Sequence, residues 1–128
     1  MADIFDIVDI AFESLNGCVE GFSFHKNRTP DNEKDCHVVV GSPVTNDQDY
    51  VSKGYVNVNI YVPRNSNGTE RRGIMQDAVR TIRAEIRNLT HPFGMYWKSR
   101  ILWSKPMESE KKGFDCMNIR IEVITELD

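Results

Sequence analysis

The cysteines and histidines are the residues whose chemistry could include metal binding. Cys36 and His37 are adjacent, while His25, His91 and Cys116 lie elsewhere in the chain. Zinc sites usually draw on pairs of ligands at short, regular spacing. No such pairing occurs in this sequence, so we expect neither a metal ion nor a cofactor. The pattern favours strand or core positions for these side chains.

Catalysis by a nucleophile or by paired carboxylates is the next chemistry to consider. The sequence has no GxSxG motif, no glycine-rich phosphate loop and no HExxH motif. Four carboxylates in polar segments could be paired for acid–base work: Asp31, Glu33, Asp47 and Asp49. Solvated charge is the ordinary role of acidic residues in such segments. We therefore expect a protein that is not an enzyme.

Arginines at helical spacing form the clearest charged pattern. Arg72, Arg80, Arg83 and Arg87 fall on one side of a helix expected at 70–89. This stripe could be a solvated helix face, a contact for a protein partner or a contact for phosphates. A net charge of −3 argues against a dedicated nucleic-acid binder, so nucleic acid is not expected as a specific ligand.

An acidic stripe lies near the start of the chain. Residues 2–16 predict an amphipathic helix with Asp6, Asp9 and Glu13 opposite its apolar side. If the two stripes lie on opposite flanks, copies of the chain could meet acidic against basic, and such a heterologous contact can close a ring. If the helices pack side by side, the stripes could pair within one chain. The candidate subunit interface comprises Asp6, Asp9, Glu13, Arg72, Arg80, Arg83 and Arg87.

A strand at Gly54–Pro63 is the most distinct element. Its aliphatic set is Val56, Val58, Ile60 and Val62, and its polar set is Tyr55, Asn57, Asn59 and Tyr61. Strict alternation of β-branched with polar side chains predicts a half-buried strand, which Gly54 and Pro63 should bracket. The polar side, together with part of a later strand, is a candidate ring-lining sheet face: Tyr55, Asn57, Asn59, Tyr61, Asn118, Arg120 and Glu122.

The remaining segments complete an α+β pattern. We expect strands at 36–40, 96–103 and 114–126, polar loops at 26–35 and 41–53, and room for a further short strand near 22–25. The helix at 70–89 has an apolar arc from Ile74 to Leu89, with Asn67 or Thr69 as its cap. Trp97 and Trp103 have the same alternation parity, which predicts a shared face.

These elements predict one domain over 1–128 with a mostly antiparallel four-stranded sheet. Both helices should pack on one face of the sheet, in the order α-β-β-α-β-β. No apolar run approaches the roughly 18 residues of a membrane span, and the start of the chain lacks the features of a signal peptide. The chain has an odd number of cysteines, three, which favours a reducing, cytoplasmic setting.

The layout of the chain resembles that of the tail-completion or tail-terminator proteins of long-tailed phages, which join tails to heads. The segment 36–68, CHVVVGSPVTNDQDYVSKGYVNVNIYVPRNSNG, carries this resemblance with the helix and hairpin that follow it. The family implies a structural protein of a phage or prophage that forms a ring, usually hexameric, at the head-proximal end of the tail tube.

The resemblance also implies partners and a location. The partners would be further copies of the chain, the tail tube and head-connector proteins, in the host cytoplasm during assembly and then in the virion tail. No catalytic residues come with the family. Two alternatives remain open: a nucleic-acid-binding accessory domain that uses the arginine stripe, and a small ligand-binding or enzyme domain.

Overall fold

The structure is a computed structural model that describes residues 4–42, 53–87, 97–109 and 111–125, with side chains for 7–42, 54–87, 99–109 and 111–123. The elements follow one another as α1 (Ile4–Leu15), β1 (Ser23–Lys26), β2 (His37–Gly41), β3 (Lys53–Pro63), α2 (Arg72–Arg87), β4 (Trp97–Met107) and β5 (Phe114–Thr125). The loop predicted at 41–53 falls largely outside the described residues. Neither described helix has the length and apolar character that crossing a membrane requires.

The five strands form one sheet in the order β1-β2-β3-β5-β4. β1 pairs in parallel with β2, and the other neighbours are antiparallel. The α+β class and the two helices agree with the sequence prediction. The expected four-stranded sheet and the order α-β-β-α-β-β were wrong, because the short segment near 22–25 is a full member of the sheet. β1 has four residues, of which only Phe24 is buried, and it is the further short strand for which the sequence left room near 22–25.

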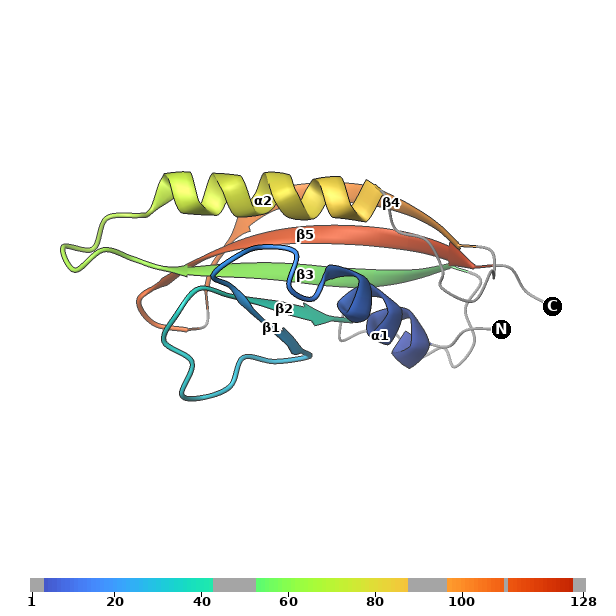
Figure 1. Cartoon of the computed structure of the whole chain (residues 1–128), viewed down its shortest axis with the longest axis horizontal. Coiled ribbons are helices and arrows are strands. Elements are labelled where there is room, and N and C mark those ends of the chain that lie inside the picture. Colours follow the sequence, from blue (N-terminus) through green and yellow to red (C-terminus); the bar gives the residue numbers. More distant parts are fainter. Residues whose placement is uncertain (1–3, 43–52, 88–96, 110, 126–128) are drawn as a thin grey trace.

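Both helices cover the same face of the sheet, as predicted. One core cluster contains Ile7 and Leu15 of α1, Ile82 and Ile86 of α2, and the aliphatic side of β3. Figure 1 shows α2 running along β5 and β4 while α1 lies beside β2 and β3. The opposite face of the sheet, which we call the outer face, has no described helix over it.

The middle of the sheet confirms the strand predicted at Gly54–Pro63. Val56, Val58 and Ile60 are fully buried. In the register with β5, Val58 lies opposite Ile119 and Val56 opposite Ile121, so the aliphatic residues of the two strands share the inner face. Gly54 and Pro63, expected to bracket β3, both belong to it, since the ladder with β5 continues to both positions.

The start of α2 differs from the prediction. The helix begins at Arg72, and neither Asn67 nor Thr69 caps it, because the two residues close a turn with each other. The Asn67 side-chain oxygen accepts hydrogen bonds from the Thr69 backbone N–H at 3.2 Å and from its hydroxyl at 2.7 Å. Ile74 was expected in the apolar arc but is 42% exposed, since it lies at the margin of that arc in the first turn.

β4 is longer than the predicted strand and contains an irregularity. The register with β5 shifts between Ile101 and Trp103, as at a β-bulge. This shift reverses the alternation, so that Trp103 lies opposite Arg120 on the outer face. The Trp97 side chain lies outside the described residues, so the expectation that Trp97 and Trp103 share a face stays a prediction.

Candidate functional site

The acidic stripe of α1 lies at the β1 edge of the molecule. Asp9 accepts a hydrogen bond from the Lys26 ammonium of β1 at 3.1 Å, and the same contact is an ion pair between half-exposed side chains. Glu13 is exposed. Asp6 belongs to α1, but its side chain lies outside the described residues. Because β1 ends the sheet, these carboxylates mark one lateral edge of the protein.

The basic stripe of α2 lies at the opposite edge. The Arg83 guanidinium donates a hydrogen bond to the Ser104 hydroxyl of β4, the strand at the other end of the sheet. Arg72, Arg80 and Arg87 are exposed. Among the residues with described side chains, no ion pair joins α1 to α2. The two stripes thus lie apart, each over one outermost strand.

Glu85 lies between the buried Ile82 and Ile86 in the sequence of α2. Its side chain is exposed, so it is not a buried charge. Burial raises the pKa of Cys18, which follows α1, and the negative charge of the Glu85 carboxylate raises it further, so Glu85 lies on the α1 side of the helix. Glu85 therefore lies on a different side of α2 from Arg83, which bonds Ser104 of β4.

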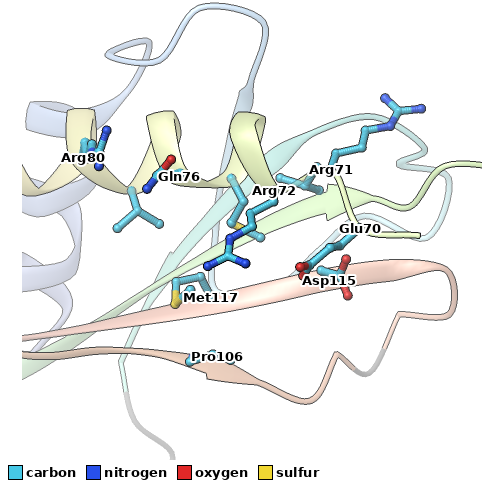
Figure 2. Close-up of a pocket in the computed structure, with 11 residues that line it drawn as sticks. Glu70, Arg71, Arg72, Gln76, Arg80, Pro106, Asp115 and Met117 are labelled. Carbon is cyan, nitrogen blue, oxygen red and sulfur yellow. The ribbon is translucent and has the colours of Figure 1, made fainter. Parts of the chain in front are cut away.

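A pocket of about 500 Å³ opens on the arginine side of α2. Its apolar lining includes Val62, Met75, Val79, Pro106 and Met117, and its polar lining includes Glu70, Arg71, Arg72, Gln76, Arg80 and Asp115. Figure 2 shows Arg72 reaching from α2 toward Met117, whereas Arg71 points away from the sheet. Asp115 pairs with Arg64 at 3.0 Å through one oxygen, and its other oxygen is buried without a hydrogen-bond partner among the described residues. The pocket offers apolar surface between groups of both charges.

The outer sheet face carries a connected set of polar contacts across β3, β5 and β4. Trp103 donates its indole N–H to the Asn118 side-chain oxygen at 2.8 Å, and Asn118 donates to Asn59 at 2.7 Å. One step along the strands, Arg120 donates through Nε to Asn57 at 2.9 Å. These cross-strand contacts fix side chains that would otherwise sample several rotamers.

The candidate ring-lining residues do lie on this outer face, but they are less solvated than expected. Asn118 is 4% exposed and Glu122 is 6% exposed. Glu122 forms an ion pair with the exposed Arg100 of β4 at 3.1 Å. The tyrosines and asparagines of β3 are half-buried. Long side chains on the adjacent strands cover these polar side chains. Alternation along one strand does not reveal this burial.

His37 is the centre of a buried cluster at the other end of the outer face. Its ring is fully buried and stacks on Tyr61 with 4.7 Å between ring centroids, and Phe114 packs edge-on at 5.4 Å. Nδ1 lies 2.8 Å from the Asp35 carbonyl, which can only accept, so Nδ1 carries the proton. Nε2 then accepts from the Thr29 hydroxyl at 3.1 Å. Burial lowers the pKa of His37 and favours this neutral form.

The loop predicted at 26–35 is therefore not simply exposed. Lys26 belongs to β1, and Thr29 and Pro30 are half-buried beside the His37 cluster. The Lys111 ammonium lies 3.4 Å from the Pro30 carbonyl and 5.2 Å from the centre of the Phe114 ring. This part of the loop packs against the sheet, which reduces what it can offer to a neighbouring subunit.

Ser23, His25 and Glu33 lie together but do not have the arrangement of a catalytic triad. The Ser23 hydroxyl donates to the Glu33 carboxylate at 2.7 Å and lies 3.3 Å from His25 Nε2. The same Nε2 faces Glu33 at 3.9 Å. In a triad the carboxylate contacts the imidazole nitrogen opposite the nucleophile. Here it contacts the serine itself, so the group serves to attach the 27–36 connection to β1.

The cysteines and histidines do not combine into a ligand set within the described residues. No group of three or more His, Cys, Asp or Glu side chains is placed there to hold a metal ion, and His91 lies outside them. Cys18, Cys36 and Cys116 are free thiols. Burial raises the pKa of Cys18 and of Cys116 to about 11 and raises that of Cys36, so all three are protonated and weakly nucleophilic at neutral pH.

Sequence reasoning missed the position of Trp103 and the burial of His37. The cations of Lys105 and Arg120 lie 4.5 Å and 4.8 Å from the centre of the Trp103 ring. A register shift within β4 brings these groups together, and no local motif signals it. For His37 the only signal was its position before Val38–Val40 at the start of a fully buried strand.

Comparison with known proteins gives a likeness of fold alone. No family model matches the sequence, and no curated protein matches it. A solved structure that bears no functional name is similar in fold, with a TM-score of 0.53 and 12% identity, over 98% of this chain and 92% of that one. This α+β arrangement therefore recurs in another protein over nearly its whole length.

Proposed function

We propose that this chain is a structural subunit of the phage or prophage tail-completion and tail-terminator type, which assembles into a ring and performs no catalysis. The observation that carries the proposal is the position of the two charged helix faces at opposite lateral edges of one sheet. A surface that complements a different surface of the same molecule makes a heterologous contact, and such contacts form a ring when the rotation between successive copies closes.

The interface would bring α1 of one copy against α2 of the next. Attraction between Asp9 and Glu13 on one side and Arg80 and Arg87 on the other would orient the copies during encounter. Charge alone contributes little free energy at an exposed interface. The pocket beside Arg80 adds apolar surface that a neighbouring subunit could cover.

The same proposal assigns partners and location. A ring of this type would meet the tail tube on one side and the head connector on the other, first in the host cytoplasm and then in the virion. The outer sheet face would line the ring, because the helices and edges of each copy would be used for contacts with its neighbours. No cofactor enters this role.

Charge reversal on one helix is expected to abolish assembly, and reversal on both helices to restore it. One variant carries Asp9→Lys with Glu13→Lys, and another carries Arg80→Glu with Arg87→Glu. Either double variant alone has the same charge at both edges. Like charges across an interface cost several kcal/mol, which lowers the affinity on the order of a hundredfold or more. The mass measured by light scattering across a concentration series, with and without the tail tube protein, reports the assembly.

Mixing the two variants provides the matched control. In an equimolar mixture the two variants should alternate, since one is basic at both edges and the other is acidic at both edges. The fourfold variant, with one edge of each charge, should assemble alone. All four substituted residues are exposed, so thermal unfolding should change little. The heterologous contact is wrong if the wild-type protein stays monomeric even with tail tube protein. It is also wrong if the fourfold variant does not assemble although both double variants are folded.

A further inference from the structure

Three cations share the outer face of β5 and β4 with Trp103. Arg100, Lys105 and Arg120 belong to these two neighbouring strands and lie on the side away from the helices. We call Trp103 and these three residues the Trp103 surface. It is separate from the arginine stripe of α2, which belongs to the helical layer on the inner side of the sheet.

The positive charge of the Trp103 surface is only partly neutralised. Glu122 pairs with Arg100, whose side chain remains 67% exposed. Within the described part of the chain, neither Lys105 nor Arg120 pairs with a carboxylate; both lie against the indole ring instead. An aromatic face holds a cation in place without cancelling its charge. At least two positive charges therefore remain available to an anionic partner.

The cations are also held in fixed positions. Arg120 uses Nε to bond Asn57, which leaves the two terminal nitrogens of its guanidinium for another acceptor. The indole that supports it is fixed by Asn118, which in turn bonds Asn59. A surface organised in advance pays less ordering entropy on binding than free arginines and lysines do.

The shape and chemistry of this surface favour a phosphodiester backbone. The cations lie on open sheet rather than in the pocket lining, so a partner with regularly spaced single charges fits better than a small anion. Proteins that bind single strands stack bases on open aromatic rings. The Trp103 ring already carries two cations, so it is better suited to orient them toward phosphates than to stack a base.

We propose that the Trp103 surface docks the phosphate backbone of a nucleic-acid duplex without reading its sequence. Phosphate contacts position a protein on a duplex, whereas contacts to base edges supply specificity. The proposal concerns one copy of the chain and does not require the ring. In a ring lined by the outer face, the surfaces of all copies would point toward the bore.

A fluorescein-labelled duplex DNA of random sequence tests this by anisotropy. With two phosphates contacted, the logarithm of the binding constant should fall with the logarithm of salt at a slope of about −1.8, or about tenfold in affinity between 20 and 80 mM salt. Lys105→Gln and Arg120→Gln should each reduce the slope by about 0.9. The matched variants Arg28→Gln and Lys34→Gln, at exposed positions between β1 and β2, should leave both affinity and slope unchanged.

Several results would overturn the proposal. These are no binding at 20 mM salt, equal binding of poly-glutamate, tighter binding of a single strand, or weakening by Arg28→Gln and Lys34→Gln in place of the sheet variants. Lys105 is exposed, so its variant keeps the test valid if Arg120→Gln disturbs the fold. Light scattering on the same samples gives the oligomeric state, so failure of the ring and failure of DNA docking are observed separately.

Discussion

Truncation of Ile60 to alanine is expected to destabilise the protein by about 2–5 kcal/mol, the largest effect of any single change considered for this chain. Ile60 is fully buried in β3, the central strand, and belongs to the cluster that both helices cover. The shorter side chain would leave a cavity between rigid sheet and helices, and the surrounding atoms can collapse only partly into it.

Chemical denaturation followed by circular dichroism measures this loss directly. Ile74→Ala is the matched control, since it removes the same atoms from a side chain that is 42% exposed on α2. Its effect should stay within about 0.5 kcal/mol, partly because alanine favours the helix. Equal destabilisation by the two variants would mean that the aliphatic face of β3 is not the core of the fold.

The second large effect is a loss of stability on mild acidification that depends on His37. Burial lowers the pKa of this imidazole in the folded protein, whereas an unfolded chain would titrate near the ordinary value of about 6.5. Below that value the unfolded state binds the proton more readily than the folded state. The free energy of unfolding should therefore fall as the pH drops from 7.5 through 6.5 and level off only below the folded-state pKa.

The contacts of His37 explain why the folded state resists protonation. Nε2 accepts from Thr29, and the ring lies between Tyr61 and Phe114 with no exposed surface. A charged imidazole would lose its water without gaining a carboxylate at hydrogen-bond distance among the described residues. For one titrating proton, the free energy of unfolding cannot change by more than about 1.4 kcal/mol per pH unit.

His37→Gln isolates the contribution of this ring. The variant should lose about 1–3 kcal/mol at pH 7.5, because it removes a buried stacked ring, and its stability should vary less between pH 7.5 and 5.5. Ile74→Ala, which leaves the contacts of His37 unchanged, should keep the pH dependence of the wild type. Denaturant unfolding at each pH gives the comparison, and an unchanged slope in His37→Gln would refute the assignment.

Patterns that lie within one element could be predicted from the sequence. The alternation Val56–Val58–Ile60–Val62 identified β3, and the apolar residues of α1 and α2 identified the helices and the sheet face that they cover. These predictions succeed because the period of side-chain burial follows directly from the geometry of a strand or a helix.

Features that depend on pairing between distant segments could not be predicted. The sequence left room for a short strand near 22–25, but the parallel pairing of β1 with β2 is not visible in those four residues. The irregularity at Leu102 depends on the register with β5, and the burial of Asn118 depends on neighbours from two other strands. A sequence shows the residue types but not which distant strands become neighbours.

The candidate sites divide in the same way. The charges of both helix stripes follow from the sequence, but their placement over β1 and over β4 required the order of the strands. The Trp103 surface required the register of β4 as well. Helical spacing predicts one face of an element, whereas a binding surface usually combines faces of several elements.

The central pair of strands has a consequence for how the chain reaches this fold. β3 and β5 are far apart in sequence, since Pro63 pairs with Phe114 and Lys53 with Ile124, and the chain between them includes α2 and β4. Chain entropy is lost when this long connection closes, before the contacts between β3 and β5 stabilise the fold. This loss slows the folding of topologies with non-local pairing. A chain cleaved in the turn at 64–70 should therefore regain the sheet only when its two fragments associate, at a rate proportional to their concentration. A concentration-independent rate in stopped-flow mixing would contradict this, because fragment complementation makes the central pairing a bimolecular step.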